Sequence, residues 1–570
     1  MSERPTGGDS YTAWRIQRDE MVADHGAVAA KHPRVAEIGL AVLRDGGNAV
    51  DAAVAMSFAI GVAEPFMNGL CGSGFMTICP AEGDPLVVDY FGRAPAAAHA
   101  TMYEMTGGDS QRDALGFRGV KDDANLFGHR AVAVPGMPAG MAVALERYGS
   151  RDWRSVVDPS IALAEEGLEA DWHFTLVSSY SLGLLRRYPA TAAIFTDNGL
   201  PWATQDLSKP TRIPQRDLAR TLRRIADQGA REFYEGETAR LIARDMAEHG
   251  GLIDEADLAA YQTHTFAALE AQYRGNTLYA LPAGSGGPTA VATLKILEGF
   301  DLTALGHNSA DALHLVTEAS RLAFADRFAY MGDESYLDVS WDELTSAEYA
   351  AQRRAAIDPR RAMERVSAGE VRASRLRPSG SRGMEGCTTY FGAIDSNRTV
   401  VSCTQTLTGL WGSGVTSPGT GVLLNNAMNL FDPLPGGPNS VAPGKRPLSN
   451  MSHFVTRRGG KPYLSVGAPG GRRIIGTVMQ SLMNVLDFGL DAQTACSGPY
   501  IDCSGPELWA SERLGPAVLN DLASRGHRLG VAPQVFWPLP FASPMALLVD
   551  DRNRLHGGAD PWYIGIAAGY

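Results

Sequence analysis

The chain has 570 residues, with 51 lysines and arginines against 63 aspartates and glutamates, which gives a formal net charge of −12. Because no basic cluster could displace the counterions of a phosphate backbone, this composition disfavours a nucleic-acid-binding protein. The longest uncharged apolar stretch, residues 52–63, is shorter than the roughly 20 residues that span a bilayer.

The N-terminus and the cysteines bear on location and redox chemistry. Residues 1–20 are polar and contain no apolar signal segment, so we expect a loose N-terminal arm and a cytoplasmic protein. The six cysteines show neither a disulfide framework nor the spacing of zinc ligands. We therefore expect no metal and no cofactor.

The N-terminal third predicts two helices followed by two strands. Apolar residues at 35, 38, 42 and 43 form one helical stripe, which ends at the glycine pair Gly46-Gly47. Residues 48–63 are almost all apolar and predict a helix that is buried on most sides. A glycine-rich turn at 68–74 precedes strands expected at 75–79 and 85–89.

The middle third, about residues 137–360, predicts mostly helix. Ser155–Glu169 and Ala310–Met331 are its clearest amphipathic runs, and a second glycine-rich turn, Leu281–Pro288, lies between them. No repeat of 20–50 residues is present.

Residues 367–386 are rich in arginine, serine and glycine and poor in apolar residues. Such a composition is typical of an exposed, mobile loop. It could be a linker between two domains, or a loop with a function of its own.

A hairpin is predicted directly after this loop, with strands over 387–394 and 399–408 around a turn at 395–398. A three-residue loop at 396–398 places Thr388 opposite Thr406. The alternation of a strand also places four hydroxyl side chains on one face: Ser402, Thr404, Thr406 and Thr408. This row is either a chemical arrangement or a solvent-exposed, threonine-rich strand favoured by its β-propensity.

Ten short motifs, in one order along about residues 20–570, resemble the γ-glutamyltransferase family. They are Gly46–Ala53, Gly72–Phe75, Val134–Gly136, Phe233–Gly236, Thr388–Tyr390, Thr404–Thr408, Gly421–Asn426, Lys445–Ser449, Gly467–Ile474 and Ala568–Tyr570. Members of this family are N-terminal-nucleophile hydrolases with a four-layer αββα sandwich, in which helices and sheets are combined. The resemblance implies an inactive precursor that cuts itself in front of a threonine.

The resemblance also implies where the cut falls and which residues act. Cleavage between Cys387 and Thr388 would give a large subunit, 1–387, and a small catalytic subunit, 388–570, intertwined in one compact fold, with 367–387 as the processing loop. Thr388 would be the nucleophile, and its new α-amine, with a reference pKa of roughly 7.7–8.0, the base. Before the cut this nitrogen is an amide and cannot accept a proton.

Thr406 corresponds to the family's threonine that hydrogen-bonds the nucleophile, and Gly470 and Gly471 to its oxyanion-hole pair. Cys387 could itself be a nucleophile, since thiolates attack amides well. The motif, however, places threonine at the new N-terminus.

The chain departs from the glutathione-cleaving members at the positions that hold the glutamyl head. Phe91 replaces the arginine that binds the α-carboxylate, and Leu430 replaces the carboxylate that binds the α-amine. Arg93, two residues after Phe91 and on the same face of an extended segment, offers a displaced carboxylate anchor or makes a surface ion pair.

Further changes lie at the other positions expected to contact substrate. Thr408 and Ala427 replace polar residues, and Ser449 is retained while its usual serine neighbour is Asn450. We therefore expect Arg93, Thr408, Leu430, Ser449 and Asn450 to line the substrate site.

Three functions remain open. The first is an amide hydrolase whose acyl group lacks the α-amino acid head. The second is a true γ-glutamyltransferase or glutathione hydrolase that uses Arg93 and Asn429 as clamps. The third is a pseudoenzyme, which the intact Thr388 disfavours. The expected partners are a small-molecule amide and a water or amine acceptor, with no nucleic acid and no membrane, and a higher oligomer remains open.

Overall fold

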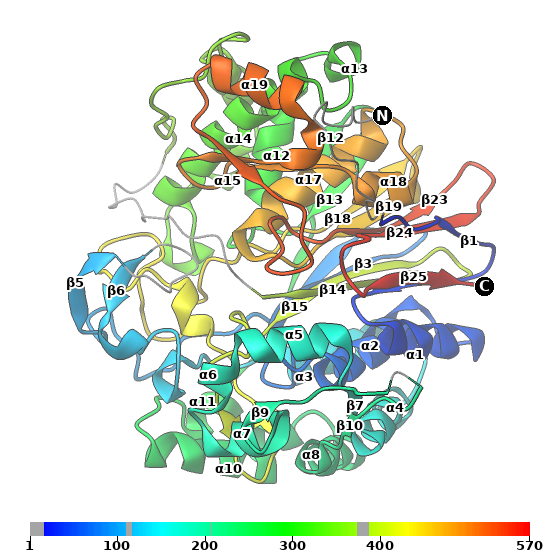
Figure 1. Cartoon of the computed structure of the whole chain (residues 1–570), viewed down its shortest axis with the longest axis vertical. Helices are drawn as coiled ribbons and strands as arrows, with labels where there is room; N and C mark the ends of the chain where they lie inside the picture. The colour runs from blue at the N-terminus through cyan, green and yellow to red at the C-terminus, as the bar shows by residue number, and fades with distance from the viewer. Residues whose placement is uncertain (1–15, 110–116, 207, 373–386) are drawn as a thin grey trace, which may run out of the picture.

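Two seven-stranded sheets stacked face to face form the centre of the computed structural model, which describes residues 16–109, 117–206, 208–372 and 387–570 (Figure 1). Sheet I contains, in spatial order, β11 (His264–Ala267), β4 (Leu86–Asp89), β3 (Ser73–Cys79), β15 (Val400–Thr406), β14 (Thr389–Ile394), β2 (Ala27–Ala30) and β25 (Ile566–Gly569). Sheet II contains β12 (Leu269–Tyr273), β13 (Asn276–Ala280), β18 (Phe454–Arg458), β19 (Lys461–Gly467), β23 (Met545–Val549), β24 (Leu555–Ala559) and β1 (Met21–Ala23).

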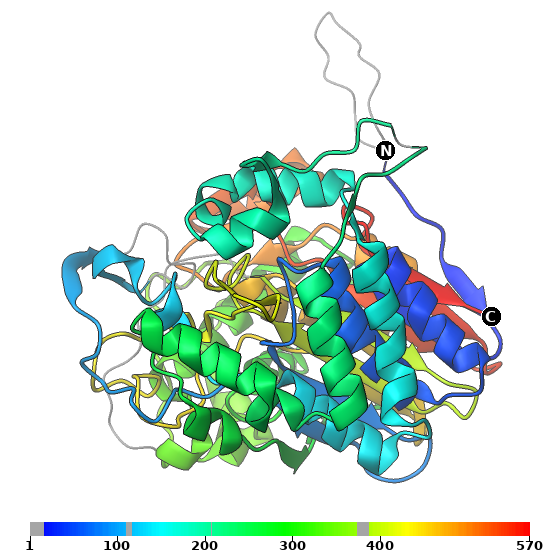
Figure 2. The same cartoon turned by 90° about the horizontal axis from the view of Figure 1, so that it is seen from below.

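Helices cover the outer face of each sheet, as Figures 1 and 2 show. The helices on the side of sheet I include α1 (Pro33–Arg44), α2 (Ala49–Ala63), α3 (Met137–Tyr148), α4 (Trp153–Glu166) and α8 (Arg216–Gln228). Those on the side of sheet II include α12 (Gly287–Leu297), α14 (Ala310–Tyr330), α17 (Ile474–Leu486) and α18 (Ala492–Ser497). Every strand pairing within the two sheets is antiparallel. The predicted αββα sandwich is confirmed.

Further helices and strands complete the fold. The helices are α5 (Trp172–Tyr180), α6 (Leu182–Leu185), α7 (Pro189–Phe195), α9 (Glu232–Glu235), α10 (Glu237–Glu248), α11 (Glu255–Ala259), α13 (Leu302–Leu305), α15 (Trp341–Leu344), α16 (Ala347–Arg354) and α19 (Pro516–Ser524). The strands are β5 (Met105–Asp109), β6 (Arg118–Val120), β7 (Leu168–Glu169), β8 (Thr196–Asp197), β9 (Leu200–Pro201), β10 (Arg212–Ile213), β16 (Thr416–Ser417), β17 (Val422–Leu423), β20 (Ile501–Asp502), β21 (Leu508–Ser511) and β22 (Leu529–Ala532).

The local signals in the N-terminal third predicted the observed elements closely. Gly46 adopts φ +84 just after α1, a conformation that costs glycine little. The Asn48 side chain accepts hydrogen bonds from the backbone of Val50 and Asp51, while Asp51 bonds back to the Asn48 N–H, which is a complete capping box. All fifteen residues of α2 are buried, as an apolar helix between a sheet and other helices must be.

The predicted hairpin has the predicted register. Thr389 pairs with Gln405 and Ile394 with Val400, so the position before β14, Thr388, lies beside Thr406. Both strands are central in sheet I and completely buried. The hydroxyl row is therefore not a solvent-exposed surface, and it ends early: β15 stops at Thr406, and Thr408 has φ +84 in the following turn.

Both sheets combine strands from the two sides of the Cys387–Thr388 bond. In sheet I, β14 and β15 lie between β3 and β2, which precede them by more than 300 residues. In sheet II, β18 and β19 lie between β13 and β23. Separating the two segments would break both sheets.

Two expectations need correction. The mostly helical middle third also contains β11, β12 and β13, because their short alternating runs are masked by the surrounding helices. The arm at 1–20 is not loose at its end: Arg18 bonds the carbonyl of Gly565, and Glu20 accepts from the Ala492 N–H. Residues 1–15 lie outside the described ones.

The described part of the predicted mobile loop, residues 367–372, is bonded to α14 and α16. The Gly369 N–H donates to Asp326 Oδ1 (2.8 Å), Tyr330 donates to the Gly369 carbonyl, and Arg353 donates to the Ser367 carbonyl (2.8 Å). Residues 367–372 therefore belong to the packed structure around α14 and α16. Residues 373–386 lie outside the described residues.

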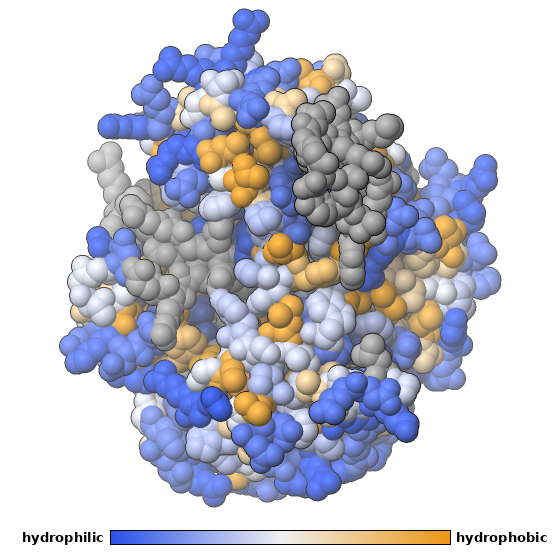
Figure 3. Space-filling model, in the orientation of Figure 1, coloured by the Kyte–Doolittle hydropathy of each residue, from blue (hydrophilic) through white to orange (hydrophobic). Residues whose placement is uncertain are grey.

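The surface shows no single large apolar area on the face drawn in Figure 3, where apolar side chains form separate small groups among polar ones. Within the described ranges, the helices are all too short or too polar to span a membrane.

Candidate active site

Thr388 lies at the entrance of β14, buried between the two sheets at 5% exposure. The Cys387 N–H donates to the Thr408 carbonyl (2.9 Å), which extends the β14–β15 pairing across the predicted cleavage site. Two hydroxyls converge on the Cys387 carbonyl oxygen: Thr388 Oγ1 donates to it at 2.6 Å, and Thr406 Oγ1 also donates to it. Thr406 Oγ1 in turn accepts from the Thr408 N–H at 2.7 Å.

This geometry changes the expected partner of Thr406. In the uncut chain the Thr406 hydroxyl bonds the carbonyl of the bond to be cut, and not the hydroxyl of Thr388. A donor on a carbonyl oxygen stabilises the negative charge that forms there when a nucleophile adds to its carbon. The arrangement therefore polarises the Cys387–Thr388 amide next to a hydroxyl that can attack it.

Gly470 and Gly471 lie in a turn between β19 and α17, and both have positive φ, +147 and +62. A Cβ on Gly470 would lie 2.5 Å from the Cα of Ala542, so only glycine fits. Gly467, three residues earlier, leaves room for the ring of Tyr390, which brings the end of β19 beside the start of β14. Their assignment as the oxyanion hole stays a prediction.

The face of β15 beyond Thr406 is filled by structural contacts. The buried ring of His453 bonds Thr77 and Thr404 at 2.8 Å each, and burial lowers the pKa of His453 to about 3. The Tyr390 hydroxyl bonds Ser402 (3.0 Å). The hydroxyls of Thr404 and Ser402 therefore bond buried side chains, whereas those of Thr388 and Thr406 bond the carbonyl of the predicted cleavage site.

Phe91 and Leu430, from segments more than 300 residues apart, belong to one apolar cluster. Phe91 is 1% exposed and stacks on Phe75 with ring centroids 5.3 Å apart. Leu430 ends a short 3-10 helix, Ala427–Leu430, and is 7% exposed. The acyl cluster, as we call it, comprises Phe75, Val87, Phe91, Leu281, Leu430 and Met451.

Backbone contacts connect this cluster to the threonine pair. Ser73 pairs with Thr406 at the start of β3, and the Ser73 hydroxyl accepts from the Gly92 N–H at 3.0 Å. The segment that contains Phe91 is therefore joined through Ser73 to the strand end that contains Thr406.

A buried ion pair holds the backbone of Phe91, one member of the cluster. Asp89, at the end of β4, pairs with Arg446, and each residue is 2% exposed. Asp89 Oδ1 also accepts from the Phe91 N–H (2.8 Å), and Asp333 Oδ2 accepts from the Arg446 N–H (2.8 Å). The sequence interpretation missed this pair, although the charged pair Lys445-Arg446 inside a matching motif was a signal.

Ser449 and Asn450 are held by a buried arginine of α14. Arg327 donates to the Ser449 carbonyl (2.6 Å), to Asn450 Oδ1 (3.0 Å) and to the Ser285 carbonyl (2.7 Å). The Ser449 hydroxyl accepts from the Met451 N–H at 3.1 Å. Both residues thus lie beside Met451 of the acyl cluster, and the Ser449 hydroxyl and Asn450 Oδ1 are engaged in the protein.

Thr408 Oγ1 and Asn429 Oδ1 are buried polar atoms with no hydrogen-bond partner among the described residues. Because Thr408 and Asn429 are only 7% and 9% exposed, bulk water does not supply the missing hydrogen bonds of these two atoms. A polar group of a bound substrate could form a hydrogen bond with either atom.

Arg93 is half-buried and forms only backbone bonds, to Val134, among the described residues. The Arg93 guanidinium lies close enough to His264, at the start of β11, to affect its charge. Burial is the main cause that lowers the pKa of His264, and Arg93 is the second. Within the described ranges, Arg93 forms no ion pair, and it is not part of the apolar cluster that contains Phe91.

All six cysteines, Cys387 included, are buried thiols. Burial raises the pKa of Cys71 and Cys503 to about 12 and that of Cys79 to about 11. They pack as small buried residues.

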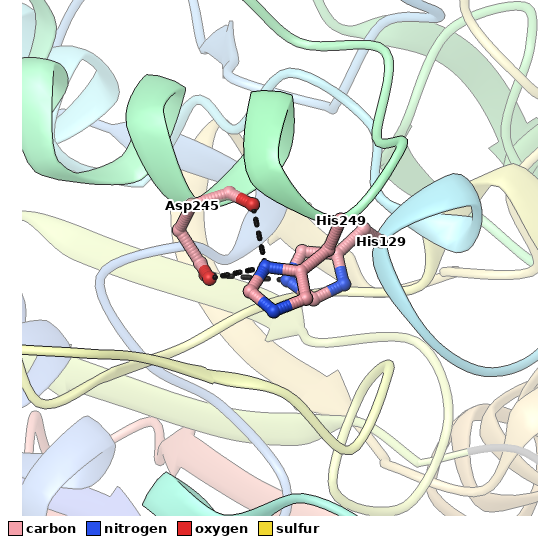
Figure 4. Close-up of side chains that lie close together, drawn as sticks. All are labelled: His129, Asp245 and His249. Atoms are coloured by element: carbon pink, nitrogen blue, oxygen red, sulfur yellow. Dashed lines mark hydrogen bonds and ion pairs between the residues drawn. The ribbon is translucent and has the colours of Figure 1, made fainter.

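A separate cluster, His129, Asp245 and His249, is the one group within the described ranges whose possible metal-ligand atoms lie within 4.8 Å of one another (Figure 4). His129 Nε2 is 3.3 Å and His249 Nδ1 3.1 Å from the Asp245 carboxylate, and the two rings stack at 4.6 Å and 9°. His249 Nδ1 also hydrogen-bonds the backbone carbonyl of Asp245 (2.9 Å), whereas His129 Nε2 and Asp245 Oδ2 have no hydrogen-bond partner among the described residues. The cluster places the His129 segment against the C-terminal end of α10.

Comparisons with known proteins agree with these observations. The family model described as Gamma-glutamyltranspeptidase matches residues 35–570. The chain is 34% identical over 565 residues to a glutathione hydrolase proenzyme of Escherichia coli (strain K12), covering 96% of this chain and 92% of that protein. It is 36% identical over 514 residues to an Acylase ACY 1 proenzyme of Pseudomonas sp. (strain SE83), covering 90% and 88%. A crystal structure of cephalosporin acylase from Bacillus halodurans superimposes with a TM-score of 0.86 at 26% identity over 99% of both chains.

Proposed function

Because this chain belongs to the gamma-glutamyltranspeptidase family of self-processing hydrolases, we propose that it cuts itself before Thr388 and then hydrolyses amides whose acyl group lacks the glutamyl α-amino head. The observation that carries the proposal is that Phe91 and Leu430, the two altered head-binding positions, share one apolar cluster.

The proposed self-cleavage begins with attack of Thr388 Oγ1 on the Cys387 carbonyl carbon. Thr406 stabilises the oxygen that becomes negative, because its hydroxyl already donates there. The C–N bond then breaks, which leaves an ester on Thr388 and a free α-amine. Water hydrolyses the ester and releases the Cys387 carboxylate.

In the mature enzyme the α-amine of Thr388 takes the proton of its own hydroxyl. The hydroxyl attacks the substrate amide, and the N–H groups of Gly470 and Gly471 bind the oxyanion. An amine leaves, and water or an acceptor amine releases the acyl group. Thr406, freed from the Cys387 carbonyl, is then available to bond Thr388 Oγ1.

The preference for the acyl group follows from desolvation. An ammonium placed against Leu430 loses water and gains no counter-ion, which costs several kcal/mol. An apolar or weakly polar acyl chain gains by burial in the same place, at roughly 25 cal/mol per Å². The acylase names of two similar proteins support this choice of substrate class.

A γ-glutamyl substrate is the second candidate. It is favoured by the unpaired oxygen of Asn429, which could accept from an α-ammonium, and by Arg93, which has no ion-pair partner in the described structure and could bind a carboxylate.

The cytoplasmic location also stays a prediction, which fractionation of the producing cells would test.

Leu430→Asp is expected to raise the turnover of γ-glutamyl-p-nitroanilide and to lower that of hydrophobic acyl amides. The new carboxylate supplies the counter-ion that the cluster lacks. Leu430→Asn is the matched control, because it has the same shape without the charge. Equal turnover by the two variants would remove Leu430 from the acyl site.

Thr406→Val is expected to slow self-cleavage by roughly 10²–10³-fold, because the variant keeps the shape but loses the donor to the Cys387 carbonyl. Gel analysis of newly made chain at timed intervals measures this rate. Cleavage at the wild-type rate would mean that the bond to Cys387 is not used in the reaction.

A further inference from the structure

The self-cleavage described above still needs a base. A threonine hydroxyl is a weak nucleophile unless a base takes its proton. In the mature enzyme the α-amine does so, but in the uncut chain that nitrogen is part of the amide. A different base must act once, before the cut.

Lys31 follows β2 directly, in an otherwise apolar run, and the sequence motifs did not single it out. Ala30 pairs with Phe391, so the register extended by one residue places Lys31 opposite Tyr390. Ala27 and Ala29 pack with Tyr390 between the sheets, whereas Val28 and Ala30 pack toward the helices. Alternation therefore places Lys31 on the inter-sheet face, which is also the face of Tyr390 and Thr388.

Lys31 and Thr388 are thus diagonal neighbours on adjacent antiparallel strands. Such positions have Cα atoms roughly 7–8 Å apart, within reach of a long side chain. Lys31 is 1% exposed, so its amine stays inside the protein near that face.

The contacts of the amine place it on the same side of the site as the predicted oxyanion turn. Lys31 Nζ donates to Ser543 Oγ at 2.7 Å and lies 3.0 Å from the centroid of the Tyr563 ring. The Ser543 N–H donates to the carbonyl of Pro469 (3.0 Å), the residue before Gly470.

We propose, on the basis of the self-cleavage proposed above, that Lys31 is the general base that takes the Thr388 hydroxyl proton in the uncut chain. Neutral Lys31 accepts the proton of Thr388 Oγ1 as the oxygen attacks the Cys387 carbonyl carbon. The resulting ammonium returns a proton to the Thr388 nitrogen as the C–N bond breaks. Lys31 ends the step neutral, and water hydrolyses the ester.

The environment of Lys31 supports a neutral amine. Burial lowers the pKa of Lys31 to about 7, and Arg18 adds to the lowering, while two carboxyl groups oppose it. The same burial raises the pKa of Glu64 to about 7, which weakens that opposition. Glu64, Asp560 and Arg18 act on the amine, which in turn acts, with His32, on His173. The Tyr563 ring beneath the amine is influenced by Glu64, Cys387 and Asp171.

The sign of the pH dependence follows. Because the reactive form is the neutral amine, the rate of self-cleavage is expected to rise as pH increases through about 7 and then to level off. A rate that falls over this range would require the ammonium and would overturn the proposal.

The test uses full-length chain made by cell-free translation, so that uncut precursor is followed from its synthesis. Lys31→Met is expected to slow cleavage at least about 100-fold. Lys31→Arg is expected to fail as well, because a guanidinium stays protonated. Added methylamine is expected to restore cleavage of Lys31→Met in proportion to its free-base concentration, which a purely structural lysine would not do. Cleavage of either variant at the wild-type rate would overturn the proposal.

Two further variants keep the test decisive. Ser543→Ala keeps the amine but removes its anchor, and it is expected to slow cleavage roughly 10–100-fold. If Lys31→Met does not fold, an unchanged rate in Ser543→Ala overturns the proposal. Lys295→Met, which removes a lysine bound to Gln272 and Glu298, is the control expected to cleave normally.

Thr388→Ala in the same assay separates the two proposals. If Thr388→Ala is cut, the assignment of the nucleophile is wrong. If Thr388→Ala stays uncut while Lys31→Met is cut, only the assignment of the base is wrong.

Discussion

Thr388→Ala is expected to yield a single uncut chain of 570 residues with no amidase activity. The variant lacks the only hydroxyl that the proposed reaction uses as a nucleophile, both on the Cys387 carbonyl and on the substrate. Removal of the nucleophile disables the catalytic groups that act together with it, so a loss of about 10⁴-fold or more is expected. Intact mass spectrometry measures the chain, and amide hydrolysis measures the activity.

Thr389→Ala is the matched control. Thr389 is the same residue type, is next in sequence and is buried, but it is on the opposite face of the strand, and its hydroxyl has no partner in the described structure. It is expected to be cut into segments of 387 and 183 residues. Cleavage of Thr388→Ala at this bond would refute Thr388 as the nucleophile, and Cys387→Ala would then test the thiol.

Arg446→Met is expected to cause the largest loss of stability among the substitutions proposed for this site. Arg446 pairs with Asp89 where both are 2% exposed, so the variant leaves an unpaired carboxylate in a buried environment. Removing one partner of such a pair costs roughly 3–5 kcal/mol. Asp89 also orients the backbone of Phe91, so the acyl cluster should loosen as well. Thermal unfolding of the purified protein measures the effect.

The double variant Asp89→Asn with Arg446→Met is expected to recover part of this loss, because the Asp89 carboxylate is then gone, while Asp333 keeps its bond to the backbone N–H of residue 446 but loses the nearby guanidinium. Arg361→Ala removes one partner of an exposed ion pair with Glu364, 73% and 83% exposed, and is expected to change stability by less than about 1 kcal/mol. A single Arg446→Met as stable as this control would mean that the buried pair does not support the site.

Local signals accounted for much of the fold. The apolar stripe before Gly46, the capping pair Asn48 and Asp51, and the hairpin loop at 396–398 each act over a few residues, so the sequence contains all the information that they need. The hairpin register is the clearest case, since the length of the loop is enough to place Thr388 beside Thr406, and the observed strand pairing confirms it.

Short strands among helices and the contacts of polar side chains were not predictable in the same way. β12 and β13 have only five residues each and lie between helices, so periodicity does not distinguish them. The Thr406 hydroxyl was expected on Thr388, but in the uncut chain it bonds the Cys387 carbonyl, a choice that depends on side-chain rotamers and on the positive φ of Thr408.

The sequence by itself determined the family, the reaction class and the expected position of the nucleophile, because these depend on residue types in a fixed order. Only the tertiary structure decided that Phe91 and Leu430 meet in one apolar cluster and that Lys31 is buried on the face of Thr388. The reason is that strand pairing and burial join residues hundreds of positions apart. A sequence pattern specifies which face a residue occupies, but not which distant residue shares it.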